Sequence, residues 1–240
     1  MMQHRSFVYR IAAVLAGIGL ITLLSPQRLA AGGKIGLYGV HMTPYGVDAK
    51  TFSRPGWGVG GHVVFPFSET YNLLAGVAGL EYINLMGERF DDFTDVGGAR
   101  FPYRQETDQH YMRLYLGGEV GGHGNGFFRP HAGMNIALVL YGISTDVVIE
   151  DEFDPEKEIR KNQSSVTHGV GGYDITLGLD LNFNNTVAID VGVRYLKSFS
   201  LPEQLGEGSV TIYPQYFQIY IGIGASFDAL HTKTGSNEGQ

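Results

Sequence analysis

The sequence predicts an all-β protein, a single eight-stranded antiparallel up-and-down transmembrane β-barrel, and three observations support this. From Phe217 to Phe227 every second residue is apolar and the residues between are small or polar, a period that only a strand with two different faces produces. Phe stands at both ends of that apolar face, as on a lipid-facing barrel strand. The 35 Gly, 14 Tyr and 14 Phe are typical of a β protein with aromatic girdles.

The N-terminus predicts a secretory signal peptide. Arg5 and Arg10 precede an apolar run, Ile11 to Leu24, and a small-residue region ends at Ala31. The run is about fourteen residues, whereas a membrane-spanning helix needs about twenty, so a retained anchor is the alternative that length disfavours. The predicted divisions are the signal peptide (1–31), one outer-membrane barrel domain (32–227) and a short periplasmic C-terminal tail (228–240).

Composition excludes several classes of protein. The chain has no Cys, which rules out a lipoprotein anchor and a disulfide scaffold. Without residues 1–31 the chain carries 14 basic and 24 acidic side chains, a formal charge of −10. We therefore expect no nucleic-acid partner, because nucleic-acid binding requires a basic surface.

Four segments in the first half of the chain show the alternation, at 34–42, 57–67, 71–83 and 109–121. In the first, Ile35 and Leu37 share one face, and Tyr38 and Val40 share the other. A polar loop (43–55), a tight turn at Ser68-Glu69 and a long charged loop (84–108) are expected between them. The outward residues are Trp57, Val59, Val63 and Phe65 in segment 57–67. In segment 71–83 they are Leu74, Ala78, Leu80 and Tyr82, and in segment 109–121 they are Met112, Leu114, Leu116 and Val120.

The second half predicts four more strands, at 131–149, 168–183, 187–199 and 214–227. A Gly-rich turn (122–129) precedes Pro130, which a strand tolerates at its start, and Asn184-Asn185 supplies turn residues. Long loops are expected at 150–167 and 200–213. The outward residues are Met134, Ile136, Leu138 and Leu140 in segment 131–149. In segment 168–183 they are Tyr173, Ile175, Leu177, Leu179, Leu181 and Phe183, and in segment 187–199 they are Val187, Ile189, Val191, Val193 and Tyr195.

One segment breaks the pattern, because beyond Tyr141 the inward positions become apolar at Ile143, Val147 and Ile149. A bulge that reverses the phase, or a β-ribbon that protrudes from the barrel, accounts for this. The alternative is an apolar upper lumen that admits a hydrophobic molecule.

Long and short connections alternate along the chain, as in outer-membrane barrels with periplasmic termini, short periplasmic turns and long extracellular loops. The aromatic residues fit two membrane interfaces. The outer rim would hold Trp57, Tyr82, Tyr173, Tyr195 and Phe217, and the periplasmic rim Phe65, Phe183 and Phe227. We therefore predict the outer membrane of a Gram-negative-type bacterium as the location.

Over about residues 33–227 the chain resembles the opacity-type and OmpA-transmembrane-like families of small outer-membrane β-barrels. The resemblance rests on the strand pattern, the segment Gly192 to Tyr195 (Gly-Val-Arg-Tyr) and the last strand ending in Phe227. It implies that the terminal aromatic strand is the signal for the outer-membrane assembly machinery. Thirteen residues, 228–240, follow Phe227, which departs from the usual chain end.

The inward positions carry charges in a barrel just wide enough for side chains to fill. The predicted lumen residues are His62, Glu81, Arg113, Tyr115, Glu119, Asp174, Asp180, Asp190, Arg194 and Tyr220. Charges in such an interior must pair, so we predict a salt-bridged plug rather than a pathway.

The hairpin after Phe183 fixes a register. Pairing Phe183 with Val187 sets Asp180 opposite Asp190, and Arg194 opposite Thr176 and diagonal to Asp174. Two facing carboxylates need a shared proton or a cation. Our hypothesis is that Arg113 reaches across the lumen to this pair.

Catalysis is not expected. The candidate pair is His168 with Ser198, but the same register sets them about 13 Å apart, too far for a nucleophile and its base. Lipid A deacylases carry a His-x-Ser-Asn segment on a comparable strand, whereas this chain has Lys197 to Ser200 there, without His. A lipid A-modifying enzyme remains an alternative.

The other motifs have plain explanations. The acidic residues from Asp151 to Glu158 could bind cations or bridge lipopolysaccharide phosphates, but their spacing matches no calcium loop, so we expect a solvated loop. The glycines from Gly56 to Gly61 lack the strand–turn–helix context of a dinucleotide site. We predict no cofactor and no metal site.

The predicted function is that of a non-catalytic barrel, porin-family-like in fold, with a structural or surface-interaction role through its extracellular loops. Its partners would be outer-membrane lipid and lipopolysaccharide, together with the assembly machinery during biogenesis. One alternative is a narrow channel or binding protein for small hydrophobic molecules. Another is a soluble lipocalin-like barrel, which would place the aliphatic side chains inside.

Overall fold

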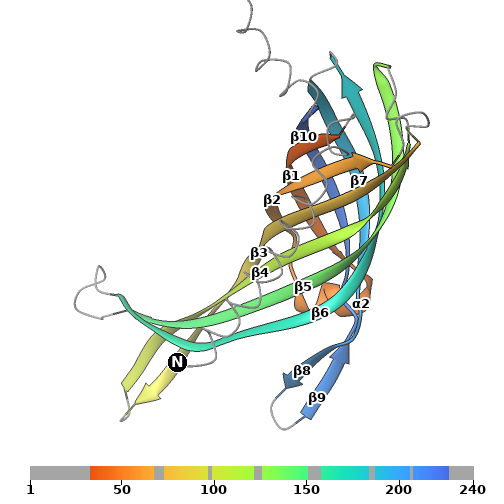
Figure 1. The fold of residues 1–240 in the computed structure, drawn as a ribbon. Helices are drawn as coiled ribbons and strands as arrows, with labels where there is room; N and C mark the ends of the chain where they lie inside the picture. The colour runs from red at the N-terminus through yellow and green to blue at the C-terminus, as the bar shows by residue number, and fades with distance from the viewer. Residues whose placement is uncertain are drawn as a thin grey trace, which may run out of the picture.

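The computed structural model describes residues 33–67, 73–96, 99–121, 126–150, 158–183, 187–205 and 208–226. In these residues eight strands form a closed barrel in the order β1-β10-β7-β6-β5-β4-β3-β2, shown in Figure 1. The strands are β1 (Lys34–Tyr45), β2 (Gly56–Pro66), β3 (Leu74–Val96), β4 (Ala99–Gly121), β5 (Phe128–Glu150), β6 (Glu158–Asn182), β7 (Val187–Ser198) and β10 (Gln215–Ser226). All pairs are antiparallel, and β10 closes the ring against β1, which confirms the predicted fold class.

Several predictions fall outside the described residues. They concern the signal peptide (1–31), the turns at Ser68-Glu69 and Asn184-Asn185, the acidic residues 151–157, Phe227 and the tail 228–240.

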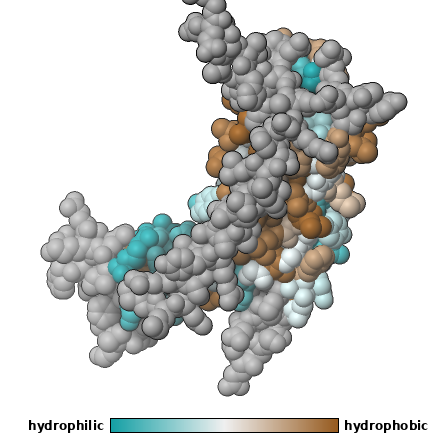
Figure 2. All heavy atoms as spheres, viewed as in Figure 1, coloured by the Kyte–Doolittle hydropathy of each residue, from teal (hydrophilic) through white to brown (hydrophobic). Residues whose placement is uncertain are grey.

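The barrel wall is apolar outside, and its interior combines buried charges with tyrosines and aliphatic side chains such as Val40 and Val139. On β10, Ile219, Ile221 and Ile223 are 62–63% exposed, whereas the intervening Tyr220 is 3% exposed. Figure 2 shows hydrophobic side chains over the barrel wall. The lipocalin-like alternative is wrong, because it requires the opposite arrangement of the two faces.

One end of the barrel carries additional elements, and we call it the mouth; the opposite end, where β1 begins, is the base. At the mouth, where a loop was expected over 43–55, β1 continues to Tyr45 and leads into helix α2 (Gly46–Phe52). Gly46 allows this turn because its φ is +81°. A helix of seven residues is too short to produce a recognisable helical period. The connection after β7 contains the hairpin β8 (Leu201–Leu205) and β9 (Gly208–Ile212).

The expected loops at 84–108 and 150–167 are largely strand instead. The four strands β3 to β6 run beyond the barrel wall at the mouth as a long curved sheet (Figure 1), which we call the extension (residues 88–96, 99–108, 144–150 and 158–165). On β6 the residues from 160 to 167 are all exposed. Such a segment needs no apolar alternation, so periodicity could not detect it. The dipeptide Gly97-Gly98 was the available signal, since Gly-Gly is typical of two-residue hairpins.

The extension explains the phase change in β5. The pairing of β5 with β6 shifts register between Thr145 and Asp146, and that of β3 with β4 shifts between Leu85 and Glu88. The protruding β-ribbon is therefore confirmed. No helix in the described ranges is long and apolar enough to cross a bilayer.

Candidate functional site

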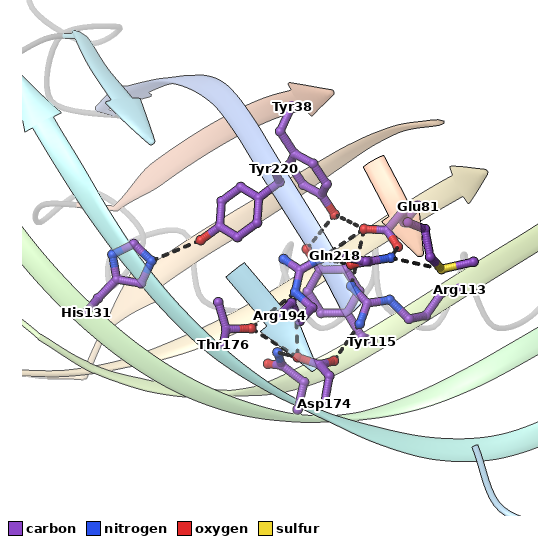
Figure 3. A network of polar contacts seen from close by, with 12 residues as sticks. Tyr38, Glu81, Arg113, Tyr115, His131, Asp174, Thr176, Arg194, Gln218 and Tyr220 are labelled. Carbon is purple, nitrogen blue, oxygen red and sulfur yellow. Dashed lines mark hydrogen bonds and ion pairs between the residues drawn. The ribbon is translucent and has the colours of Figure 1, made fainter. Parts of the chain in front are cut away.

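A network of buried charges fills the middle of the lumen (Figure 3). Glu81 on β3 accepts hydrogen bonds from Arg113 Nη2 at 3.3 Å and Arg194 Nη1 at 2.9 Å. Asp174 on β6 accepts one from Arg113 Nη1 at 2.6 Å and forms an ion pair with Arg194 Nε at 3.7 Å. Two carboxylates and two guanidinium groups thus form a buried network with balanced charge.

Neutral polar groups complete the network. Gln218 donates from Nε2 to Glu81 at 2.6 Å and accepts from Arg194 Nη1 at 3.0 Å. Asn135 donates to Asp174 at 2.7 Å, and the Tyr38 hydroxyl donates to Glu81 at 3.0 Å. Each of the eight barrel strands except β2 contributes one residue to the network. These residues are Tyr38, Glu81, Arg113, Asn135, Asp174, Arg194 and Gln218. The network therefore links strands that do not pair with one another.

Aromatic rings enclose the two guanidinium groups. The Arg113 guanidinium carbon lies 4.3 Å from the centroid of the Tyr115 ring, and that of Arg194 lies 4.9 Å from the Tyr220 ring. Cation–π attraction of this kind is strongest where water is excluded. The rings and the charged groups thus lie together inside the lumen.

A second cluster lies nearer the base. Asp180 and Asp190 are paired across β6 and β7, and Arg194 is paired with Thr176, so the predicted register is confirmed. The hypothesis about Arg113 is wrong, because Arg113 binds Glu81 and Asp174. The cation at the facing carboxylates is Lys34, whose Nζ lies 2.6 Å from Asp180 and 3.6 Å from Asp190.

The other predicted lumen residues lie in the same region. His62 is buried, with Nε2 3.8 Å from Asp190 Oδ2, and Glu119 lines a small cavity beside it. Sequence reasoning missed Lys34, His131, Asn135 and Gln218. Each lies an even number of residues from an inward residue of the same strand, such as Tyr38, Val139 or Tyr220, and therefore on the same face. This spacing is the signal that could have identified them.

We expect Asp190→Asn to leave the free energy of unfolding unchanged or to raise it at neutral pH. The substitution leaves Asp180 and Lys34 as a balanced pair, whereas the native cluster has two facing carboxylates for one ammonium group. Urea unfolding in detergent measures this free energy. The comparison is Asp180→Asn, which removes the nearer partner of Lys34 and should therefore be less stable than Asp190→Asn. A loss of more than about 1 kcal/mol in Asp190→Asn would contradict the expectation.

A third layer, of tyrosines, lies toward the mouth. The Tyr111 ring makes edge contacts with Tyr141 and Tyr216, at centroid distances of 5.2 and 5.8 Å. The Tyr216 hydroxyl is 3.0 Å from Ser53 Oγ, just beyond α2. Above these rings is a pocket of about 240 Å³. Its lining includes Asp48, Ala49, Leu85, His110, Ile143 and Ile212.

The predicted rim aromatics lie on the outer surface where they are described. Trp57, Tyr82 and Phe183 are exposed, and Phe65 and Tyr173 are partly exposed. At the mouth Phe217 packs 5.6 Å from Tyr195 between ring centroids. Tyr45, which prediction placed in a loop, adds a third ring 5.1 Å from Phe217.

Ser198, the candidate nucleophile, is buried. It is 3% exposed and its Oγ lies 2.7 Å from the Tyr141 hydroxyl. It pairs with Gly172 on β6, as the predicted register requires, and His168 lies four residues from Gly172 along β6, where it pairs with Tyr141 on β5.

No known family model matches the sequence, and no curated protein matches it. In structure the chain is similar to a major outer membrane protein from Thermus thermophilus, with a TM-score of 0.50 and 10% identity over 81% of this chain and 99% of that one. It also matches Neisserial surface protein A, with a TM-score of 0.48 and 11% identity over 81% and 96% of the two chains. The outer membrane protein OprG from Pseudomonas aeruginosa matches with a TM-score of 0.43 and 14% identity over 83% and 98%. With its closed ring of eight strands, the chain has the fold of the small outer-membrane β-barrels.

Proposed function

We propose that this protein is a non-catalytic barrel of the outer membrane with a closed lumen, and that its mouth carries its interactions at the cell surface. The observation that supports a closed lumen is the network around Glu81 and Asp174, in which both carboxylates and the Arg113 side chain are 0% exposed. Charged and aromatic side chains of that network lie inside the lumen, and opening a path for ions between them would separate buried charges.

The apolar exterior supports insertion in a lipid bilayer. Large exposed aliphatic side chains, such as Leu37, Ile136 and Ile221, cover the wall on several strands, and a water-soluble monomer rarely exposes so much apolar surface. The rim aromatics at the mouth suit a membrane interface. Outer-membrane lipid and lipopolysaccharide are therefore the proposed surroundings.

The extension supports a surface role because charged and polar side chains pair across its strands. Arg160 binds Glu106 at 2.7 Å and Asp146 at 3.5 Å across three strands, and Asn162 donates to Asp146 at 2.7 Å. Such ladders hold a polar sheet together outside the bilayer. The extension would then present a stable surface to partners outside the cell.

Two measurements test the proposal. In planar bilayers the purified barrel, identified by a gel-mobility shift on boiling, should show no reproducible conductance; discrete channels would refute the closed lumen.

On intact cells a membrane-impermeant maleimide should label Phe93→Cys in the extension but not Phe67→Cys at the base. The native chain has no Cys and both side chains are exposed, at 59% and 69%, so the reversed labelling pattern would refute the orientation.

A second candidate function is the binding of a small amphipathic molecule at the mouth. The 240 Å³ pocket combines aliphatic side chains with Asp48 and His110 at its edge, the mixture that small-molecule sites use. Equilibrium dialysis with a small alkylphenol tests this, and Ala49→Leu, which fills the pocket, should abolish binding.

A further inference from the structure

Side chains that ligate metals converge at the base of the lumen. Donor atoms of His131, Asp180 and Asp190 lie within 4.8 Å of one another, and all three residues are buried. His131 Nε2 is 3.8 Å from Asp190 Oδ1, and His62 Nε2 is 3.8 Å from Asp190 Oδ2. Two imidazoles therefore flank one carboxylate, with a second carboxylate beside it.

This cluster contains polar atoms without partners. In the part of the chain that the structure describes, His62 Nε2 and Asp190 Oδ1 have no hydrogen-bond partner, although the two residues are only 9% and 4% exposed. Buried polar atoms nearly always have one. His62, His131 and Asp190 also line a cavity of about 20 Å³, which is room for one water molecule or one ion.

Two glycines leave the space that the two imidazole rings occupy. A Cβ atom on Gly36 would collide with His62 Nε2, and one on Gly178 would collide with His131 Nε2. Only glycine permits so close an approach of a ring to the backbone. The missing side chains on β1 and β6 thus create the space in which both rings face Asp190.

We propose that this cluster binds one divalent transition-metal ion of the zinc class. His131, Asp180 and Asp190 would be the first three ligands and His62 the fourth. Imidazole and carboxylate donors together select such ions, whereas calcium and magnesium require more oxygen ligands. Ligand atoms around tetrahedral zinc lie roughly 3.4 Å apart, so His131, Asp180 and Asp190 need to contract only slightly around the ion. His62 lies outside that group of three but is 3.8 Å from Asp190, so its ring would have to move closer to complete the site.

Lys34 and Tyr220 compete with the ion for its ligands. The Lys34 ammonium group lies 2.6 Å from Asp180 and its side chain is 14% exposed, so it stands between the cluster and the base of the barrel. Metal binding must displace the ammonium from Asp180 or share that carboxylate with it, and either way the positive charge of Lys34 opposes the ion. The Tyr220 hydroxyl, 3.3 Å from His131 Nε2, must release that nitrogen.

The test is zinc binding to the full chain as purified from membranes, without a polyhistidine tag and after EDTA treatment. Equilibrium dialysis should find one Zn²⁺ per barrel, and His62→Gln and His131→Gln should each weaken binding at least roughly tenfold. His41→Gln is the matched control, because His41 packs on the outer wall against Trp57 at a centroid distance of 4.4 Å. The gel shift on boiling verifies that each variant is folded.

A gain of affinity provides a second test that misfolding cannot imitate. Lys34→Gln removes the competing charge and should tighten zinc binding by roughly tenfold or more. Absence of stoichiometric zinc, binding that both His62→Gln and His131→Gln retain, or weaker binding in Lys34→Gln would each overturn the proposal. Because conductance does not enter these measurements, they stand apart from the test of the closed lumen.

Discussion

Glu81→Gln should lower the free energy of unfolding by about 3–5 kcal/mol, the cost of breaking a buried ion pair by removing one partner. Glu81 is fully buried and accepts hydrogen bonds from both Arg113 and Arg194. Without its charge, two buried guanidinium groups share Asp174 alone. Gln keeps the shape of Glu, so the loss reports the missing charge rather than a cavity.

Urea unfolding of the barrel in lipid vesicles measures this effect. The matched control is Glu106→Gln in the extension, where Glu106 pairs with Arg160, whose side chain is 53% exposed. An exposed pair contributes about 0–1 kcal/mol, so the control should unfold almost as the native protein does. Equal losses at the two positions would mean that the lumen network has no special role in stability.

Tyr216→Ala should cost about 3–5 kcal/mol of unfolding free energy, the range for removing a large buried aromatic side chain. Tyr216 is 1% exposed and contacts both Tyr111 and Tyr141. Tyr216→Phe removes only the hydroxyl that faces Ser53 and should cost about 1 kcal/mol.

The next residue provides the control for Tyr216. Phe217 points outward, is 45% exposed and touches Tyr45 and Tyr195. Phe217→Ala should cost about 0.5–1.5 kcal/mol, the contribution of aromatic pairing. The same unfolding assay compares the two variants, and a larger loss for Phe217→Ala would contradict the assignment of inner and outer faces.

The parts of this fold that were predictable depend on contacts between neighbouring strands. Alternation placed Glu81, Asp174 and Arg194 inside, and the parity of Phe183 and Val187 fixed the partner of Asp190. Both arguments use the strict two-residue period of a strand.

The rest depends on geometry that no single hairpin contains. Arg113 on β4 meets Asp174 on β6, strands that do not pair, and the height of each residue in the lumen follows from the stagger around the whole ring. Lys34 was overlooked because it begins β1, so only its even spacing from Tyr38 and Val40, later in the strand, marks its face. On β3, β4 and β6 the extension gives no apolar period, so these segments resembled loops.

The closure between β1 and β10 constrains the order in which the chain can assemble. Every other pairing joins strands adjacent along the barrel sequence, but Lys34 meets Ser226 only after nearly all of the described chain has been made. Local hairpins form early, while such a distant contact forms late. Until then β1 and β7 would each present unpaired backbone groups, which lipid does not tolerate. Biogenesis therefore has to shield the edge of the first strand until the last one arrives.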